Sequence, residues 1–115
     1  MVEFHPDFAV EFMALNEQVQ DELAAYAELL KAVGPQLRRP YSDTLKGSAH
    51  ANMKELRFEA ADGVWRVAYA FDPDRKAILL VAGDKAGVSQ RRFYASLIRK
   101  ADQRYDAHLG ARRKT

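Results

Sequence analysis

Residues 54–85 read KELRFEAADGVWRVAYAFDPDRKAILLVAGDK and combine strand-forming segments with turn sequences. One turn contains Asp62 and Gly63, and the next is Asp72-Pro73-Asp74-Arg75. Apolar runs separated by such short polar turns are typical of consecutive antiparallel strands. We therefore predict a three-stranded meander over residues 54–60, 63–71 and 76–84.

The middle predicted strand has two different faces because side chains alternate along a strand. One face is large and apolar: Trp65, Val67, Tyr69 and Phe71. The opposite face carries small residues and one cation: Val64, Arg66, Ala68 and Ala70. We predict that the aromatic face is buried in the core. On the opposite face we expect Arg66 to be solvent-accessible, with room above it for a ligand or a partner helix.

Arg57 and Arg66 should meet on that opposite face. Leu56 and Phe58 share the apolar face of the preceding strand, so Arg57 points the other way together with Glu55. Two neighbouring arginines are costly unless an anion, a carboxylate or water satisfies them. We interpret the pair as an anion site.

Composition narrows the class of protein. A chain of 115 residues without cysteine is expected to form one domain over 1–115 without disulfides, and the cytoplasm is the expected compartment. No apolar run approaches the roughly 20 residues that cross a bilayer, and no signal peptide is evident.

The net charge of +2 is unevenly distributed, because residues 1–33 are acidic and residues 85–115 are basic. The basic end could meet phosphates or an acidic protein, or it could be a solvated helix face.

The N-terminal part predicts a short strand at residues 2–5 followed by a helical hairpin. Pro6 and Asp7 are suited to start one helix, and Asn16 to cap a second helix that stops at Gly34-Pro35. Their apolar positions follow the helical period, so the hairpin should cover the aromatic face of the sheet. The expected fold is α+β, with a small antiparallel sheet of about four strands.

The remaining segments predict a long loop and a C-terminal helix. Residues 35–53 lack periodicity, apart from a short strand expected near residues 44–46, and His50 in this loop is either an exposed imidazole or a general base. Ser89 can cap a helix that ends at Gly110 and whose apolar residues recur every four positions. We expect a frayed basic tail over 109–115 and assign His108 to the surface.

The candidate chemistry rests on cations. The chain has no phosphate-binding glycine loop, no HExxH, no GxSxG and no histidine cluster for a metal. These absences argue against a cofactor enzyme, so we expect no cofactor. Cations and one phenol gather on the predicted meander and helix: Lys54, Arg57, Arg66, Lys85, Arg91, Arg92 and Tyr94. Such a set suits a phosphodiester, and RNA supplies its own nucleophile, the 2′-hydroxyl, so that no metal is required. Simple binding without catalysis is the alternative.

Two segments resemble the RelE/ParE toxin superfamily, especially its HigB-like, phage Gp49-related branch. These are LKGSAHANMKELRF (residues 45–58) and GVWRVAYAFDPDRKAILLVAGDKAGVSQRRFY (residues 63–94), and the order of elements matches over nearly the whole chain. The resemblance implies the toxin of a bacterial type II toxin–antitoxin pair. In the RelE and HigB branches it implies an endoribonuclease, or mRNA interferase, that cuts mRNA in the ribosomal A site.

The resemblance also suggests site residues and partners. Arg57 and Arg66 match the strand arginines, and Lys54, Lys85 and Tyr94 lie near other family site residues. The chain departs from the family pattern at two positions, because Lys54 shares the Leu56 side of its strand and Glu55 stands where RelE-like toxins tend to be basic. The general base therefore stays open between Lys54 and Glu55. The helix cations Arg91, Arg92 and Arg99 are expected to bind RNA. Expected partners are the cognate antitoxin, mRNA and the ribosome, with no membrane. The rival hypotheses are a ParE-like toxin that inhibits DNA gyrase without cutting RNA, and an inactive descendant kept as a binding module.

Overall fold

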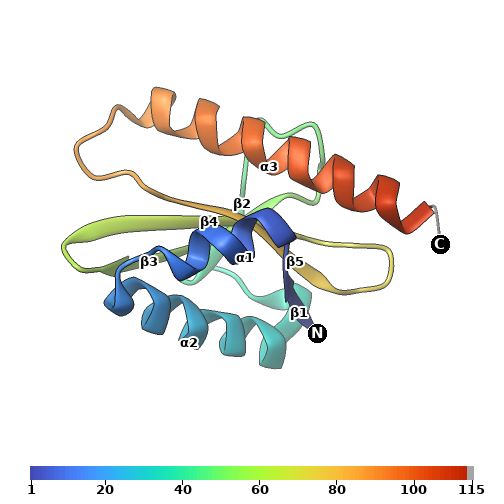
Figure 1. Cartoon of the computed structure of the whole chain (residues 1–115), viewed down its shortest axis with the longest axis horizontal. Helices are drawn as coiled ribbons and strands as arrows, with labels where there is room; N and C mark the ends of the chain where they lie inside the picture. Colours follow the sequence, from blue (N-terminus) through green and yellow to red (C-terminus); the bar gives the residue numbers. More distant parts are fainter. Residues whose placement is uncertain (114–115) are drawn as a thin grey trace.

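A computed structural model of the chain describes residues 1–113, in which one sheet lies between two helical layers (Figure 1). The strands are β1 Val2–Phe4, β2 Ser42–Thr44, β3 Lys54–Ala60, β4 Gly63–Phe71 and β5 Ala77–Asp84. Their order in the sheet is β1-β5-β4-β3-β2, with β1 parallel to β5 and every other pair antiparallel. The predicted α+β class and meander are confirmed. The expected sheet was antiparallel with about four strands. It is instead five-stranded and mixed, because both short edge strands join the meander and β1 pairs parallel to β5.

The N-terminal helices cover the aromatic face of the sheet, as predicted. Helix α1 spans Pro6–Met13 and helix α2 spans Glu17–Val33, followed by a short 3-10 turn at Gly34–Gln36. The Asn16 side chain caps α2 by accepting a hydrogen bond from the backbone N–H of Gln18 at 2.7 Å. Buried side chains of both helices pack against the inward residues of the meander: Phe8, Leu23 and Leu30 against Leu56, Phe58, Val67 and Tyr69.

Helix α3, Gln90–Arg113, covers the opposite face of the sheet (Figure 1). Its buried residues Phe93, Leu97, Ala101 and Tyr105 pack over the small side chains of the sheet, including Ala68 and Ala70, and form a second core. The expectation that this face lies open is therefore wrong over most of its area. Small residues on a strand leave room for a helix, and here the chain's own helix occupies that room.

Two details near the C-terminus differ from the sequence expectations. Gly110 lies inside α3 rather than ending it, and residues 111–113 of the predicted basic tail are helical, while residues 114–115 lie outside the described residues. His108 is part-buried, since its Nε2 lies 2.8 Å from Asp72 Oδ2 and its ring stacks on Tyr105. The sequence places His108 near the end of a helix, but it does not show that the β4–β5 turn, which carries Asp72, lies against that end.

His50 in the long loop is also held by α3. Its Nε2 lies 2.7 Å from Asp106 Oδ1, and its ring packs edge-on against Tyr105. The strand predicted near residues 44–46 lies at Ser42–Thr44, two residues earlier. Within residues 1–113, no helix combines the length and apolar character needed to cross a bilayer.

Candidate functional site

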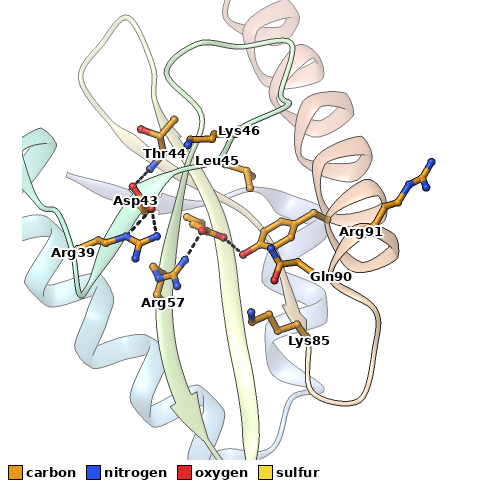
Figure 2. A pocket seen from close by; sticks show the side chains of 11 residues that line it. Arg39, Asp43, Thr44, Leu45, Lys46, Arg57, Lys85, Gln90 and Arg91 are labelled. Carbon is orange, nitrogen blue, oxygen red and sulfur yellow. Dashed lines mark hydrogen bonds and ion pairs between the residues drawn. The ribbon is translucent and has the colours of Figure 1, made fainter.

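An open pocket of about 530 Å³ lies where β2, β3 and the start of α3 meet (Figure 2). Most of the side chains around it are polar or charged. Its lining consists of Arg39, Asp43, Thr44, Leu45, Lys46, Glu55, Arg57, Lys85, Gln90, Arg91 and Tyr94. Here the face that α3 otherwise covers is left accessible, because the helix begins only at Gln90.

Glu55 is the centre of a compact polar cluster in the wall of this pocket. Its carboxylate accepts hydrogen bonds from Arg57 Nη1 at 2.8 Å and from the Tyr94 hydroxyl at 2.8 Å. Arg66 Nε lies 3.9 Å from Glu55 Oε1 and donates to the Tyr94 hydroxyl at 3.3 Å. Another Arg66 donor, Nη1, is satisfied by the Trp65 carbonyl at 2.9 Å. One carboxylate thus lies among two guanidinium groups and a phenol.

Burial makes the electrostatics of this cluster strong. The side chains of Glu55 and Arg66 are 5% and 8% exposed, whereas that of Arg57 is 23% exposed. One carboxylate against two guanidinium groups leaves a net positive charge, and only Arg57 offers it substantially to the pocket. Burial, and then the hydrogen bond to Glu55, raise the pKa of the Tyr94 hydroxyl, which is therefore protonated at neutral pH. The pocket wall offers cationic and phenolic hydrogen-bond donors to an anion.

The loop after β5 carries a further cation to the pocket. Asp84 Oδ1 accepts the backbone N–H groups of Val64 and Ala86, both at 2.9 Å, and the Lys85 N–H donates to the Val64 carbonyl at 2.8 Å. These bonds fix the loop, and Figure 2 shows Lys85 pointing toward the pocket. Ser89 then caps α3 as predicted, since its hydroxyl accepts from the Arg92 N–H at 3.3 Å.

The structure brings together some of the predicted residues and separates others. Arg57, Lys85 and Tyr94 lie at the pocket. Arg66 contacts Tyr94 behind them and is buried, so the expectation that it is solvent-accessible is wrong. Lys54 does not line the pocket, because it pairs with Tyr69 and shares the face of Leu56 toward the helical hairpin.

The predicted helix cations are also dispersed. Arg91 lies at the pocket rim, and Figure 2 shows its side chain pointing away from Arg57 toward solvent. Arg92 lines a separate groove beside Phe93 and Lys100. Arg99 is exposed about two turns beyond Arg92 along α3 and lines none of these pockets. The geometry therefore favours the strand and loop residues over the helix arginines as the centre of the site.

Arg39 and Asp43 were missed by sequence reasoning. They form an ion pair, with Arg39 Nη2 and Asp43 Oδ2 2.7 Å apart, on the far wall of the pocket. Their four-residue spacing resembles a helical pair, but here it spans a turn and an edge strand. The aperiodic loop gave no signal that it would border the site.

Comparisons with known proteins agree with this architecture. A solved structure of a mutant of Escherichia coli toxin RelE in the free state superposes with a TM-score of 0.61 at 13% identity, covering 87% of this chain and 94% of that one. The fold is therefore RelE-like. The family described as "Phage derived protein Gp49-like (DUF891)" matches residues 10–106. The chain belongs to this Gp49-like family.

Two relatives from Mycobacterium tuberculosis (strain ATCC 25618 / H37Rv) carry toxin names. "Putative toxin HigB3" is 43% identical over 100 residues, which cover 87% of this chain and 85% of that protein. "Putative toxin HigB2" is 41% identical over 96 residues, covering 83% of this chain but only 47% of that protein. The chain thus spans about half the length of HigB2 and most of HigB3. The resemblance to HigB toxins seen in the sequence is confirmed.

Proposed function

We propose that this protein is the toxin of a type II toxin–antitoxin pair and acts as a ribosome-dependent mRNA interferase. The cluster of Glu55, Arg57, Arg66 and Tyr94 carries the proposal, because it joins a proton acceptor, two cations and a proton donor beside an open basic pocket. The relatives named as HigB toxins support the toxin assignment.

The cluster is suited to cleave a phosphodiester with the RNA 2′-hydroxyl as nucleophile. Glu55 takes the 2′-hydroxyl proton as the 2′-oxygen bonds to phosphorus, and Arg57 stabilises the charge on the phosphate oxygens. Tyr94 gives its proton to the departing 5′-oxygen. The products are a 2′,3′-cyclic phosphate and a 5′-hydroxyl. The 2.8 Å hydrogen bond between Tyr94 and Glu55 is the direct route by which the proton returns from the carboxyl group to the phenolate.

Arg66 and Lys85 have supporting roles in this proposal. Arg66 does not line the first pocket and donates to Tyr94 and the Trp65 carbonyl, so it holds the Tyr94 oxygen and balances the charge of Glu55 from behind. Lys85, on its fixed loop, neutralises phosphate charge at the pocket mouth. Of the two candidate general bases, Glu55 is preferred, since Lys54 lies on the other face of β3.

The test is induction of the protein in bacteria, followed by mapping of mRNA 5′ ends. We expect new ends with 5′-hydroxyl groups within translated messages, and none in messages whose translation is blocked. Loss of growth with intact messages would overturn the nuclease assignment. Accumulation of double-strand-broken DNA trapped on gyrase would instead identify the gyrase-inhibiting class of toxin.

A further inference from the structure

A second pocket, of about 420 Å³, opens around the end of β2 and adjoins the first. We call it the edge pocket. Its lining relevant here comprises Tyr26, Phe58, Glu59, Arg39, Arg57 and Arg66. Arg39 and Arg57 line both pockets, so the two adjoin at these side chains near the edge of the sheet.

The edge pocket exists because β2 is shorter than β3. The paired residues of β2 face only Lys54–Leu56, and the Arg57 N–H makes the last bond across this edge, to the Tyr41 carbonyl at 2.9 Å. Backbone groups point to alternate edges along a strand, so those of Glu59 point the same way as those of Arg57. At Glu59 no strand among residues 1–113 covers that edge. The pocket therefore offers a backbone donor and acceptor.

The wall on the hairpin side is aromatic. The ring centroids of Tyr26 and Phe58 are 5.1 Å apart, with an interplanar angle of 38°. The ring centroid of Tyr41 lies 6.1 Å from that of Tyr26. Phe58 is only 5% exposed, so it supports Tyr26 from below and fixes its ring. An aromatic ring beside a phosphate-binding arginine is the usual platform for an unpaired nucleobase.

The opposite wall of the edge pocket carries a carboxylate. Glu59 is exposed and forms no ion pair or side-chain hydrogen bond among residues 1–113. A carboxylate accepts hydrogen bonds from base edges that carry N–H groups. Guanine presents two such donors side by side, N1–H and the N2 amino group, whereas uracil presents one.

We propose that the edge pocket binds the nucleobase next to the scissile phosphate and prefers guanine through Glu59. This inference rests on the proposed function for its substrate class. The base stacks on Tyr26 while its phosphate lies at Arg57, and Glu59 reads the edge of the base. An extended peptide could also pair with the free edge of β3, but three arginines in the lining favour a nucleotide.

The experiment is titration of 15N-labelled protein with dinucleotides that are methylated at the 2′-oxygen and cannot be cleaved. Four are used, with guanine, adenine, cytosine or uracil beside a constant uridine. We expect guanine to bind about tenfold tighter than uracil, with the largest shifts at the amides of Tyr26, Phe58 and Glu59. Glu59→Gln should reduce that preference to about twofold or less, because the amide offers only one acceptor oxygen.

Matched variants separate the contributions. Glu28→Gln removes the same charge on the exposed side of α2 that faces away from Tyr26, and should keep the preference. Tyr26→Leu should weaken all four dinucleotides about fivefold or more, whereas Tyr26→Phe, which keeps the ring, should not.

The outcomes distinguish this inference from the proposed function. Binding without base preference, or shifts confined to Lys85 and Tyr94, would overturn the edge pocket even if the protein cleaves mRNA. A guanine preference lost in Glu59→Gln would support it even in a protein without nuclease activity, since the assay needs no cleavage. If the dinucleotides leave the β3 edge unchanged and purified antitoxin protects its amides from exchange, the pocket is a peptide site and the proposal fails.

Discussion

Arg57 and Arg66 lie directly opposite each other on β3 and β4, and the carboxylate of Glu55 lies against both guanidinium groups. Opposed arginines repel, and the carboxylate that contacts both of them offsets this repulsion. Glu55 also accepts from Tyr94, which ties the start of α3 to the sheet. The same contacts that stabilise the pair define the candidate site.

Replacing Arg57 should remove activity without unfolding the protein. Arg57 is the cluster cation that reaches the pocket, so Arg57→Ala should lower the cleavage rate by about 10²- to 10³-fold, as expected for loss of one transition-state contact. Single-turnover cleavage on programmed ribosomes measures the rate. Lys31→Ala removes one positive charge from the exposed end of α2 and is the matched control. Equal rates in Arg57→Ala and wild type would remove Arg57 from the site.

Glu55→Gln should separate binding from catalysis. Glutamine keeps one acceptor oxygen for either Arg57 or Tyr94, which in Glu55 donate to different carboxylate oxygens, and it cannot take the 2′-hydroxyl proton, so cleavage should fall by about 10²-fold or more. RNA binding should become tighter, because the pocket loses its central negative charge. Filter binding and single-turnover cleavage check the two effects. Weaker binding together with unchanged cleavage would contradict the assignment of Glu55 as the base.

Arg66→Ala should destabilise the fold as well as remove activity. The side chain is 8% exposed and donates to Tyr94 and to the Trp65 carbonyl, so its loss leaves Glu55 and both acceptors short of a partner. We expect a loss of about 2–4 kcal/mol in the free energy of unfolding. Urea unfolding measures it, with Arg66→Met as the variant that keeps the apolar stem. Unchanged stability in Arg66→Ala would show that the side chain is not buried as described.

Asp72 should make stability depend on acidity. Burial raises the pKa of Asp72, but hydrogen bonds from His108 and from the backbone N–H groups of Lys76 and Asp74 outweigh it, so the folded pKa lies below the usual value. A lowered folded pKa contributes stability above the unfolded pKa of roughly 4, and this stability is lost as the pH falls through the folded pKa.

Asp72→Asn should therefore unfold more easily than wild type at about pH 7, and the difference should shrink toward about pH 3. Urea unfolding across this range measures the difference. Asp62→Asn, at the exposed β3–β4 turn, is the control for removing a carboxylate. A difference that stays constant with pH would show that the Asp72 carboxylate has no such role.

The antitoxin should associate faster at low salt. The pocket and its surroundings present Arg57, Lys85 and Arg91, which attract a partner that carries carboxylates. Stopped-flow mixing should show an association rate that falls as salt screens these charges, with a smaller change in dissociation. An association rate independent of salt would exclude the basic pocket as the antitoxin's point of encounter.

Much of the fold followed from local patterns. Alternation with period two defined both faces of β4, and Asn16 and Ser89 capped their helices where the sequence predicted. The placement of Arg57 and Arg66 on one face also followed, because the apolar faces of two paired strands must coincide, and the short turn between the strands then sets them opposite each other. Such features depend only on nearest-neighbour geometry.

The composition of the site was decided by the tertiary structure. Glu55 and Tyr94 are 39 positions apart in sequence, and they meet only because α3 packs back over the small residues of β4. That packing buries Arg66, leaves Lys54 on the other face and brings the aperiodic loop with Arg39 to the pocket rim. Sequence periodicity reports which face of an element is apolar, but not which distant element will cover it, because that choice depends on how all the faces fit together.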